Sequence, residues 1–165
     1  MDFRIDAHIA VGVDDSHLAW NAISRLWDAV DFSSGPRAVN ELLGHATLGQ
    51  RALFAIDWLQ KEVRNGGFGQ FFENRAGMLA HDALDGFLLV GAGAYAELVS
   101  QAIDAFPGHR VPQARTARVR ALRQIPDRKL VFEALDDAFL DLIESDDLET
   151  YRGGYVRHHP EEFLL

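Results

Sequence analysis

The stretch that decides the fold is residues 62–77, EVRNGGFGQFFENRAG, in which two adjacent glycines are followed by three phenylalanines. The residues before it carry a helical repeat, so a left-handed helix C-terminus is expected at Asn65 and Gly66. Gly67 then allows the chain to reverse into a second helix. The apolar anchors of that second helix are Phe68, Phe71 and Phe72. We interpret the stretch as a corner between two buried helices.

The same stretch has a second interpretation, because its polar side chains would fit around a small cleft. They are Glu62, Asn65, Gln70 and Asn74, with Glu73 beside them. The stretch contains no pair of nucleophile and base, and two glycines alone do not cradle a phosphate. The corner is therefore favoured, and a ligand pocket is kept as the alternative.

A 3.6-residue apolar repeat recurs throughout the chain, whereas the alternating pattern of strands is nearly absent. Asp14 and Asp15 can cap a first helix, which should stop before the sequence SSGP at 33–36. Thr47 can cap a long helix that is apolar on two sides, with Trp58 on its second side. A helix of this kind is normally central in its fold.

Further helical segments follow this central helix. Residues 78–106 predict a helix with a break near GAGAY at 91–95, and a short arginine-rich helix is expected between Pro112 and Pro126. Residues 127–145 predict a long amphipathic helix. The chain then ends in an expected helical hairpin with Gly153 and Gly154 at its corner. We predict an all-α, single-domain helical bundle of about seven or eight helices.

The domain organisation is expected to be simple. At 165 residues the chain has the length of one domain, and it shows no repeat, low-complexity tract or linker. Residues 1–13 are expected to form a short extended N-terminal arm, because a lone strand there has no partner. Residues 14–165 are expected to form the helical body.

Composition excludes several classes of protein. The chain has no cysteine, which rules out disulfides, thiolate catalysis and zinc sites built on cysteine. No apolar run approaches the roughly 20 residues that a membrane-spanning helix needs, and the first residues lack the basic start of a signal peptide. We therefore expect a cytoplasmic protein with no membrane contact.

Two motifs suggest ligands at first sight. Gly91-x-Gly93-x-x-Ala96 imitates a dinucleotide fingerprint, but its flanks are helical, so small residues at a helix contact explain it better. His158 and His159 precede two glutamates, yet adjacent histidines on a regular element point in different directions. We expect no cofactor and no metal, and we assign no catalytic residue.

Charge is distributed unevenly along the chain, whose formal net charge is −9. Residues 110–129 hold seven of the sixteen Lys and Arg residues but only one acid, Asp127. The remaining surface is therefore strongly acidic, which repels nucleic acid and attracts cationic partners. We expect no direct nucleic-acid binding. The arginine-rich segment could instead pair with acidic groups of this chain or of a second copy.

The long helix at 127–145 concentrates this negative charge. Five carboxylates are expected on its side opposite the apolar residues: Glu133, Asp136, Asp137, Asp141 and Glu144. With about 1.5 Å of rise per residue, they give one charge per 3–4 Å of helix axis. One strand of duplex DNA carries its phosphates about 3.4 Å apart along the axis. This helix could therefore present a phosphate-like row of charge to a basic protein.

The chain also resembles a known family. The resemblance lies in LGQRALFAIDWLQKEVRNGGFGQFF at 48–72, AFPG at 105–108, a Leu-Asp-Asp-x-Phe segment at 135–139 and a terminal HPEEF. These stretches resemble the DNA-mimic-protein family, most of whose members are bacterial domains of unknown function. The most specific residues belong to the fold motif: Trp58, Gly66, Gly67, Phe68, Phe71 and Phe72.

The resemblance covers roughly residues 16–163 and implies an all-α domain. It also implies a dimeric acidic protein that imitates duplex DNA and keeps a helix-turn-helix repressor from its operator. Many members have a bulky residue where this chain has Gly69.

Three functions follow from these observations. The first is a non-enzymatic protein, with a possible homodimeric state, that sequesters a basic DNA-binding protein such as a helix-turn-helix regulator. The second is an immunity-like or antitoxin-like inhibitor of a basic nuclease. The third is a small-molecule-binding protein or enzyme that uses the polar pocket near Asn65 and Gln70.

Overall fold

The computed structural model describes residues 1–165 and contains helices without a named strand. The α-helices are α1 (Asp15–Ala29), α2 (Pro36–Leu43), α3 (Leu48–Glu73), α4 (Ala80–Leu89), α5 (Gly93–Asp104), α6 (Arg115–Arg123), α7 (Arg128–Ser145), α8 (Leu148–His158) and α9 (Pro160–Phe163). Four short 3₁₀ helices are η1 (Ala7–Ala10), η2 (Phe32–Ser34), η3 (Arg75–Leu79) and η4 (Pro107–His109). The all-α prediction is confirmed. No helix has both the length and the apolar character needed to cross a membrane.

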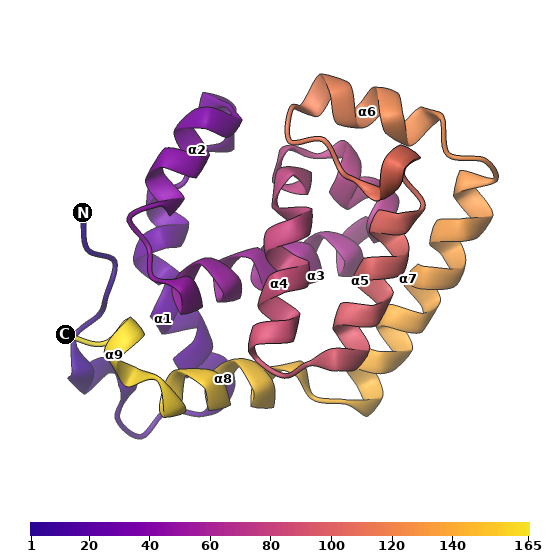
Figure 1. The fold of residues 1–165 in the computed structure, drawn as a ribbon. Coiled ribbons are helices and arrows are strands. Elements are labelled where there is room, and N and C mark those ends of the chain that lie inside the picture. The colour runs from indigo at the N-terminus through magenta and orange to yellow at the C-terminus, as the bar shows by residue number, and fades with distance from the viewer.

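The helices are arranged around α3. In Figure 1, α4, α5 and α7 run side by side, α6 crosses one end of this group, and α8 crosses the other. Helix α3 packs against α4, α7, α6 and α1, and α8 carries the chain back to α1. One continuous core of 38 buried residues joins these elements. The central position predicted for α3 is confirmed.

The predicted helix caps are present. The carboxylate of Asp14 accepts the backbone N–H of His17 at 2.9 Å, which caps α1. The hydroxyl of Thr47 accepts the backbone N–H of Gln50 at 3.2 Å, and the Gln50 side chain accepts the N–H of Thr47 in return. Both caps satisfy backbone donors that a helix N-terminus leaves free.

The glycine corner is a kink within α3. Gly67 is its only non-helical residue, with φ of 84° and ψ of 176°, whereas Gly66 remains helical. The left-handed position expected at Asn65 and Gly66 is therefore wrong by one or two residues. The three phenylalanines after the kink are fully buried, as predicted. Gly67 therefore separates two helical parts of α3, and the predicted corner between two helices lies at this residue.

The second pair of glycines does not form the predicted corner. Gly153 and Gly154 lie inside α8, which runs without interruption to His158 and turns only at His159, before Pro160. A Cβ at Gly153 would overlap Asp15, at the start of α1. Gly153 therefore lets two helices approach closely, and the expected hairpin corner is absent.

The N-terminal arm finds a partner at the other end of the chain. The N–H of Ile5 donates to the carbonyl of Phe163 at 2.8 Å, and the N–H of Leu165 donates to Ile5 at 2.9 Å. Phe3 and Ile5 are buried, and η1 follows them. The expectation of an unpaired extended arm is corrected, because the C-terminal residues supply the missing backbone partners. The two termini consequently lie on the same side of the molecule (Figure 1).

Candidate functional site

Four of the five predicted acidic residues form one exposed row on α7. Glu133, Asp137, Asp141 and Glu144 are all exposed, and we call them the α7 acidic stripe. Their spacing of four, four and three residues places them on one side of the helix. The stripe spans about 16 Å at 1.5 Å per residue. Helix α7 lies at the outer edge of the molecule (Figure 1).

Asp136 does not belong to this stripe. Its side chain is half-buried, and Oδ1 accepts the backbone N–H of Phe68 at 2.7 Å, just after the kink in α3. Burial raises the pKa of Asp136, the hydrogen bond from Phe68 opposes that rise, and Asp137 and Glu133 add to it. The expectation that this carboxylate projects away from the core is wrong, because Phe68 needs an acceptor there.

The stripe is almost unpaired within the chain. Only Glu133 has a cationic partner, with Lys129 Nζ 3.7 Å from its carboxylate. Of the arginines in 110–129, none makes an ion pair with α7. The arginine-rich segment therefore leaves the charge of Asp137, Asp141 and Glu144 available to a partner.

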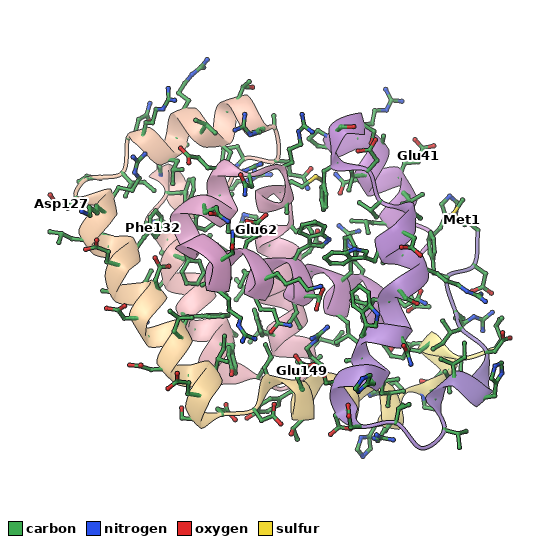
Figure 2. The ribbon with its side chains drawn as sticks, turned by 180° about the vertical axis from the view of Figure 1, so that it is seen from behind. Met1, Glu41, Glu62, Asp127, Phe132 and Glu149 are labelled. Carbon is green, nitrogen blue, oxygen red and sulfur yellow. The ribbon has the colours of Figure 1, made fainter.

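Three further acids follow the stripe and have local structural roles. Asp146 accepts the hydroxyl of Tyr151 at 3.1 Å, and Asp147 accepts the backbone N–H of Glu149 at 3.0 Å, which caps α8. Both carboxylate oxygens of Glu149 accept from the same nitrogen of Arg152, Nη1, at 2.8 and 2.9 Å. Figure 2 shows Asp127 where α6 meets α7, and Glu149 just beyond the other end of α7. The acidic end and the arginine-rich end are thus separated along α7.

Three of the four predicted pocket residues meet at Glu62. Its Oε2 atom accepts the side-chain amides of Gln70 and Asn74, both at 2.9 Å. Asn65 is exposed and takes no part in this group. The two bonds join the part of α3 before Gly67 to the part after it, so the group holds the kink in place (Figure 2 labels Glu62).

A hollow of about 490 Å³ lies on one side of this group. Its lining residues are Phe32, Trp58, Glu62, Asn74, Arg75, Ala76 and Arg115. The sequence interpretation found Glu62 and Asn74 but missed Phe32, Arg75 and Arg115. These three come from η2, η3 and α6, and no local pattern links them to α3.

A buried arginine supports the end of α3 beside the hollow. Arg118 is fully buried and donates to the carbonyls of Phe72 and Asn74 at 2.8 Å. It also donates to those of Pro112 and Gln113, at 3.0 and 2.7 Å. Burial, with a neighbouring guanidinium, lowers the pKa of Arg118 to about 10. It has no carboxylate partner, so carbonyl dipoles alone compensate its charge.

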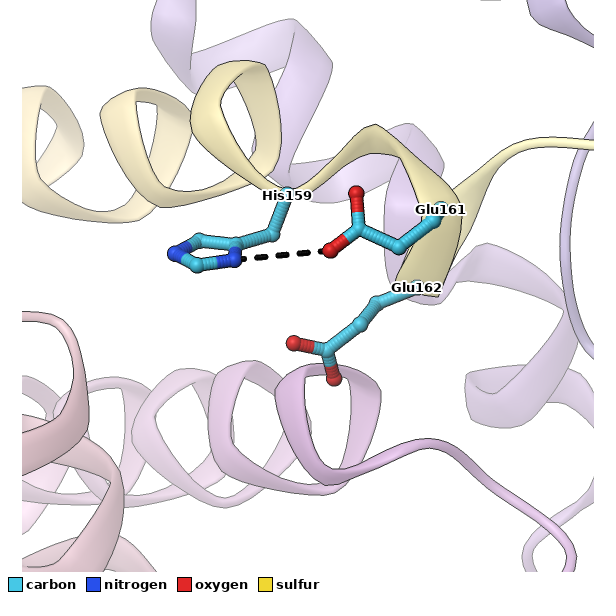
Figure 3. Close-up of side chains that lie close together, drawn as sticks. All are labelled: His159, Glu161 and Glu162. Carbon is cyan, nitrogen blue, oxygen red and sulfur yellow. Dashed lines mark ion pairs between the residues drawn. The ribbon is translucent and has the colours of Figure 1, made fainter.

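The C-terminal turn gathers three side chains with metal-ligating atoms. His159 Nδ1 lies 3.5 Å from Glu161 Oε1, and donor atoms of these two residues and Glu162 all lie within 4.8 Å of one another (Figure 3). Glu162 already accepts the N–H of Gly49 at 2.5 Å and the hydroxyl of Tyr155 at 2.8 Å. His159, Glu161 and Glu162 carry the ligand atoms that could hold a divalent cation. Glu162 also has a structural role, because the hydrogen bond that it accepts from Gly49 anchors α9 to the start of α3.

The structure defines a class of protein: a helical bundle without a named strand, bearing a free acidic row on an outer helix. The DMP19-like protein family matches residues 45–159, which is more than half of the chain. The chain therefore belongs to this family, the DNA-mimic-protein family that its sequence resembles. Searches of the curated proteins and of the solved structures gave no match.

Proposed function

We propose that this protein is a non-enzymatic DNA mimic, which binds a basic DNA-binding protein through the α7 acidic stripe. The observation that carries the proposal is the exposure of four aligned carboxylates, three of which have no ion pair in the chain. Family membership supports the same class of function.

The carboxylates of the stripe lie about 4.5–6 Å apart along the helix axis, a wider spacing than the roughly 3.4 Å between phosphates of one DNA strand. Four carboxylates lie along about 16 Å of helix axis, and one DNA strand carries about five phosphates over the same length. Lysine and arginine side chains that contact phosphates would meet a somewhat lower charge density on α7. An acidic surface of this kind also accelerates association with a cationic partner at low salt.

The test is a matched pair of charge-reversal variants. The stripe variant carries Asp137→Lys, Asp141→Lys and Glu144→Lys. The control variant carries Asp28→Lys, Glu41→Lys and Asp85→Lys, three exposed acids that make no hydrogen bond or ion pair. Both triple variants change the net charge equally, so they separate the stripe from a general effect of charge.

The partner is captured from the source cell at low salt, eluted by rising salt and identified by mass spectrometry. We expect the stripe variant to bind it at least about tenfold more weakly, with a smaller salt dependence, because several ion pairs are lost. The control should bind like the wild type. Equal affinity and salt slope for the stripe variant and the wild type would refute the proposal.

The identity of the partner separates two versions of the proposal. A helix-turn-helix regulator that the protein displaces from its operator supports mimicry in gene regulation. A basic nuclease whose activity is blocked supports the immunity-like alternative, which would use the same stripe.

A further inference from the structure

We propose that the hollow beside Trp58 binds a small organic anion, namely a carboxylate or phosphate group attached to a flat apolar group. The hollow is separate from the α7 acidic stripe. The proposal therefore does not depend on the function proposed above.

The first observation is an excess of positive charge around the hollow. Arg75 and Arg115 both line it, and neither makes an ion pair. Arg115 uses only Nε, which donates to the carbonyl of Glu73 at 2.8 Å, so its two terminal nitrogens remain free. The Arg75 side chain makes no hydrogen bond. Guanidinium groups of this kind bind carboxylates and phosphates through paired N–H donors.

A third guanidinium lies behind these two. Arg118 is fully buried, contacts the carbonyl of Arg75 at 3.4 Å and has no acidic partner. Only Glu62 among the lining residues is acidic. In a chain with a net charge of −9, a hollow with this balance selects anions against the general character of the surface.

The second observation is a rigid aromatic wall. The rings of Phe32 and Trp58 meet edge to face, with centroids 5.1 Å apart. Trp58 is stacked on Trp27 at 4.3 Å with an interplanar angle of 7°, which fixes the orientation of its ring. Its indole Nε1 is shielded from solvent and has no acceptor. A flat apolar group can pack against such a wall while its charge meets the arginines.

The third observation is that the polar wall is already ordered. Glu62 and Asn74 are held by the hydrogen bonds that join the two parts of α3. A ligand therefore loses less binding energy in ordering the site than it would in a mobile one. The volume of about 490 Å³ lies in the range of small-molecule sites, roughly 300–1,000 Å³.

The probes are indole-3-acetate, which is a flat carboxylate, and adenosine 5′-monophosphate, which is a flat phosphate. Tryptamine and adenosine have related rings without the negative charge, and inorganic phosphate has the charge without a ring. Binding is followed by the indole N–H signals of ¹⁵N-labelled protein. The variants are Arg75→Gln and Arg115→Gln, and Arg120→Gln is the control, because Arg120 is exposed on α6 and does not line the hollow.

We expect at least one flat anion to shift the Trp58 signal to saturation, with a dissociation constant below about 10 mM. Each lining variant should weaken the affinity for that anion at least about fivefold. Arg120→Gln should bind like the wild type. Saturation by indole-3-acetate would identify the ligand as a carboxylate, and saturation by adenosine 5′-monophosphate would identify it as a phosphate. The proposal is overturned if neither flat anion saturates the shift, or if the lining variants bind with the affinity of the wild type. It is also overturned if inorganic phosphate, adenosine or tryptamine binds as tightly as the flat anions.

Discussion

Replacing Gly67 by alanine should destabilise the protein far more than the small change in size suggests. Gly67 has φ of 84° and ψ of 176°, a region that residues with a side chain rarely adopt. Forcing alanine into such a conformation costs about 1–3 kcal/mol. The added Cβ would also overlap the carboxylate of Asp136. Two separate costs therefore fall on one substitution.

The second cost follows from the role of Asp136. Its carboxylate caps the part of α3 after the kink by accepting the N–H of Phe68 at 2.7 Å, and the new methyl group would displace it. Loss of a helix cap costs about 1 kcal/mol. The total expected for Gly67→Ala is about 2–4 kcal/mol, and each kcal/mol lowers Tm by about 2–4 °C in a chain of this length.

Gly69→Ala is the matched control. Gly69 is helical, and the nearest atom to an added Cβ is Phe132 Cδ2 at 3.9 Å, which is ordinary contact. Alanine there should stabilise the helix by about 0.5–1 kcal/mol. Urea unfolding followed by circular dichroism measures both variants. The double variant Gly67→Ala, Asp136→Ala should cost less than the sum of the single changes, because the cap is lost once.

A Gly67→Ala protein as stable as the wild type would refute this reasoning, since neither the backbone conformation nor the contact with Asp136 could then be as described. Additive effects in the double variant would refute the contact alone.

Three further predictions concern stability and can be measured by the same unfolding assay. Asp136→Asn should keep the cap. As pH rises above about 4, the wild type should lose stability relative to this variant, because the raised pKa of Asp136 disfavours its ionisation in the folded protein. A stability difference that does not change with pH would contradict this. Arg118→Met should cost about 3–5 kcal/mol, since it leaves five carbonyls without their donor. A loss below about 1 kcal/mol, on the order of a surface substitution, would contradict it. Gly153→Ala should destabilise the protein by about 1–3 kcal/mol, because the added Cβ overlaps Asp15. Gly154→Ala has open space around its Cβ and should stabilise the helix slightly. Equal effects of the two changes would contradict the close approach of α1 and α8.

Local signals in the sequence predicted most of the helices. The caps at Asp14 and Thr47 depend only on residues within three positions, and both are present. The break before α5 is also local, because Gly91 adopts a φ of 81°. The 3.6-residue repeat identified which helix is central, since a helix that is apolar on two sides must have neighbours on both.

Contacts between distant segments could not be predicted in this way. The paired glycines at 66–67 and 153–154 look alike in sequence, yet one pair contains a left-handed residue and the other is helical throughout. What distinguishes them is the neighbour that each meets: Asp136 beside Gly67 and Asp15 beside Gly153. Helix α2 is absent from the sequence prediction, because Gly35 and Pro36 read locally as the end of a helix, whereas Pro36 is the first residue of α2.

The candidate sites show the same division. Helical spacing predicted the four members of the α7 acidic stripe, because the 3.6-residue repeat of α7 alone indicates which of its side chains face solvent. It misplaced Asp136, whose position at the edge of the apolar side becomes meaningful only when α3 packs beside it. The arginines of the hollow lie on η3 and α6, so their proximity to Trp58 depends on the complete fold.

Fold and proposed function rest on different atoms of this chain, and the two can therefore change independently. The motif that most resembles the family supplies Phe68, Phe71 and Phe72, which are fully buried and specify the packing of α3. The α7 acidic stripe is exposed, and exposed substitutions usually change stability by less than about 0.5 kcal/mol. Asp136 lies between these groups: it interrupts the acidic row in sequence but serves the kink in α3. A relative that keeps the motif and the equivalent of Asp136 but replaces the stripe would thus keep this fold and lose the proposed partner.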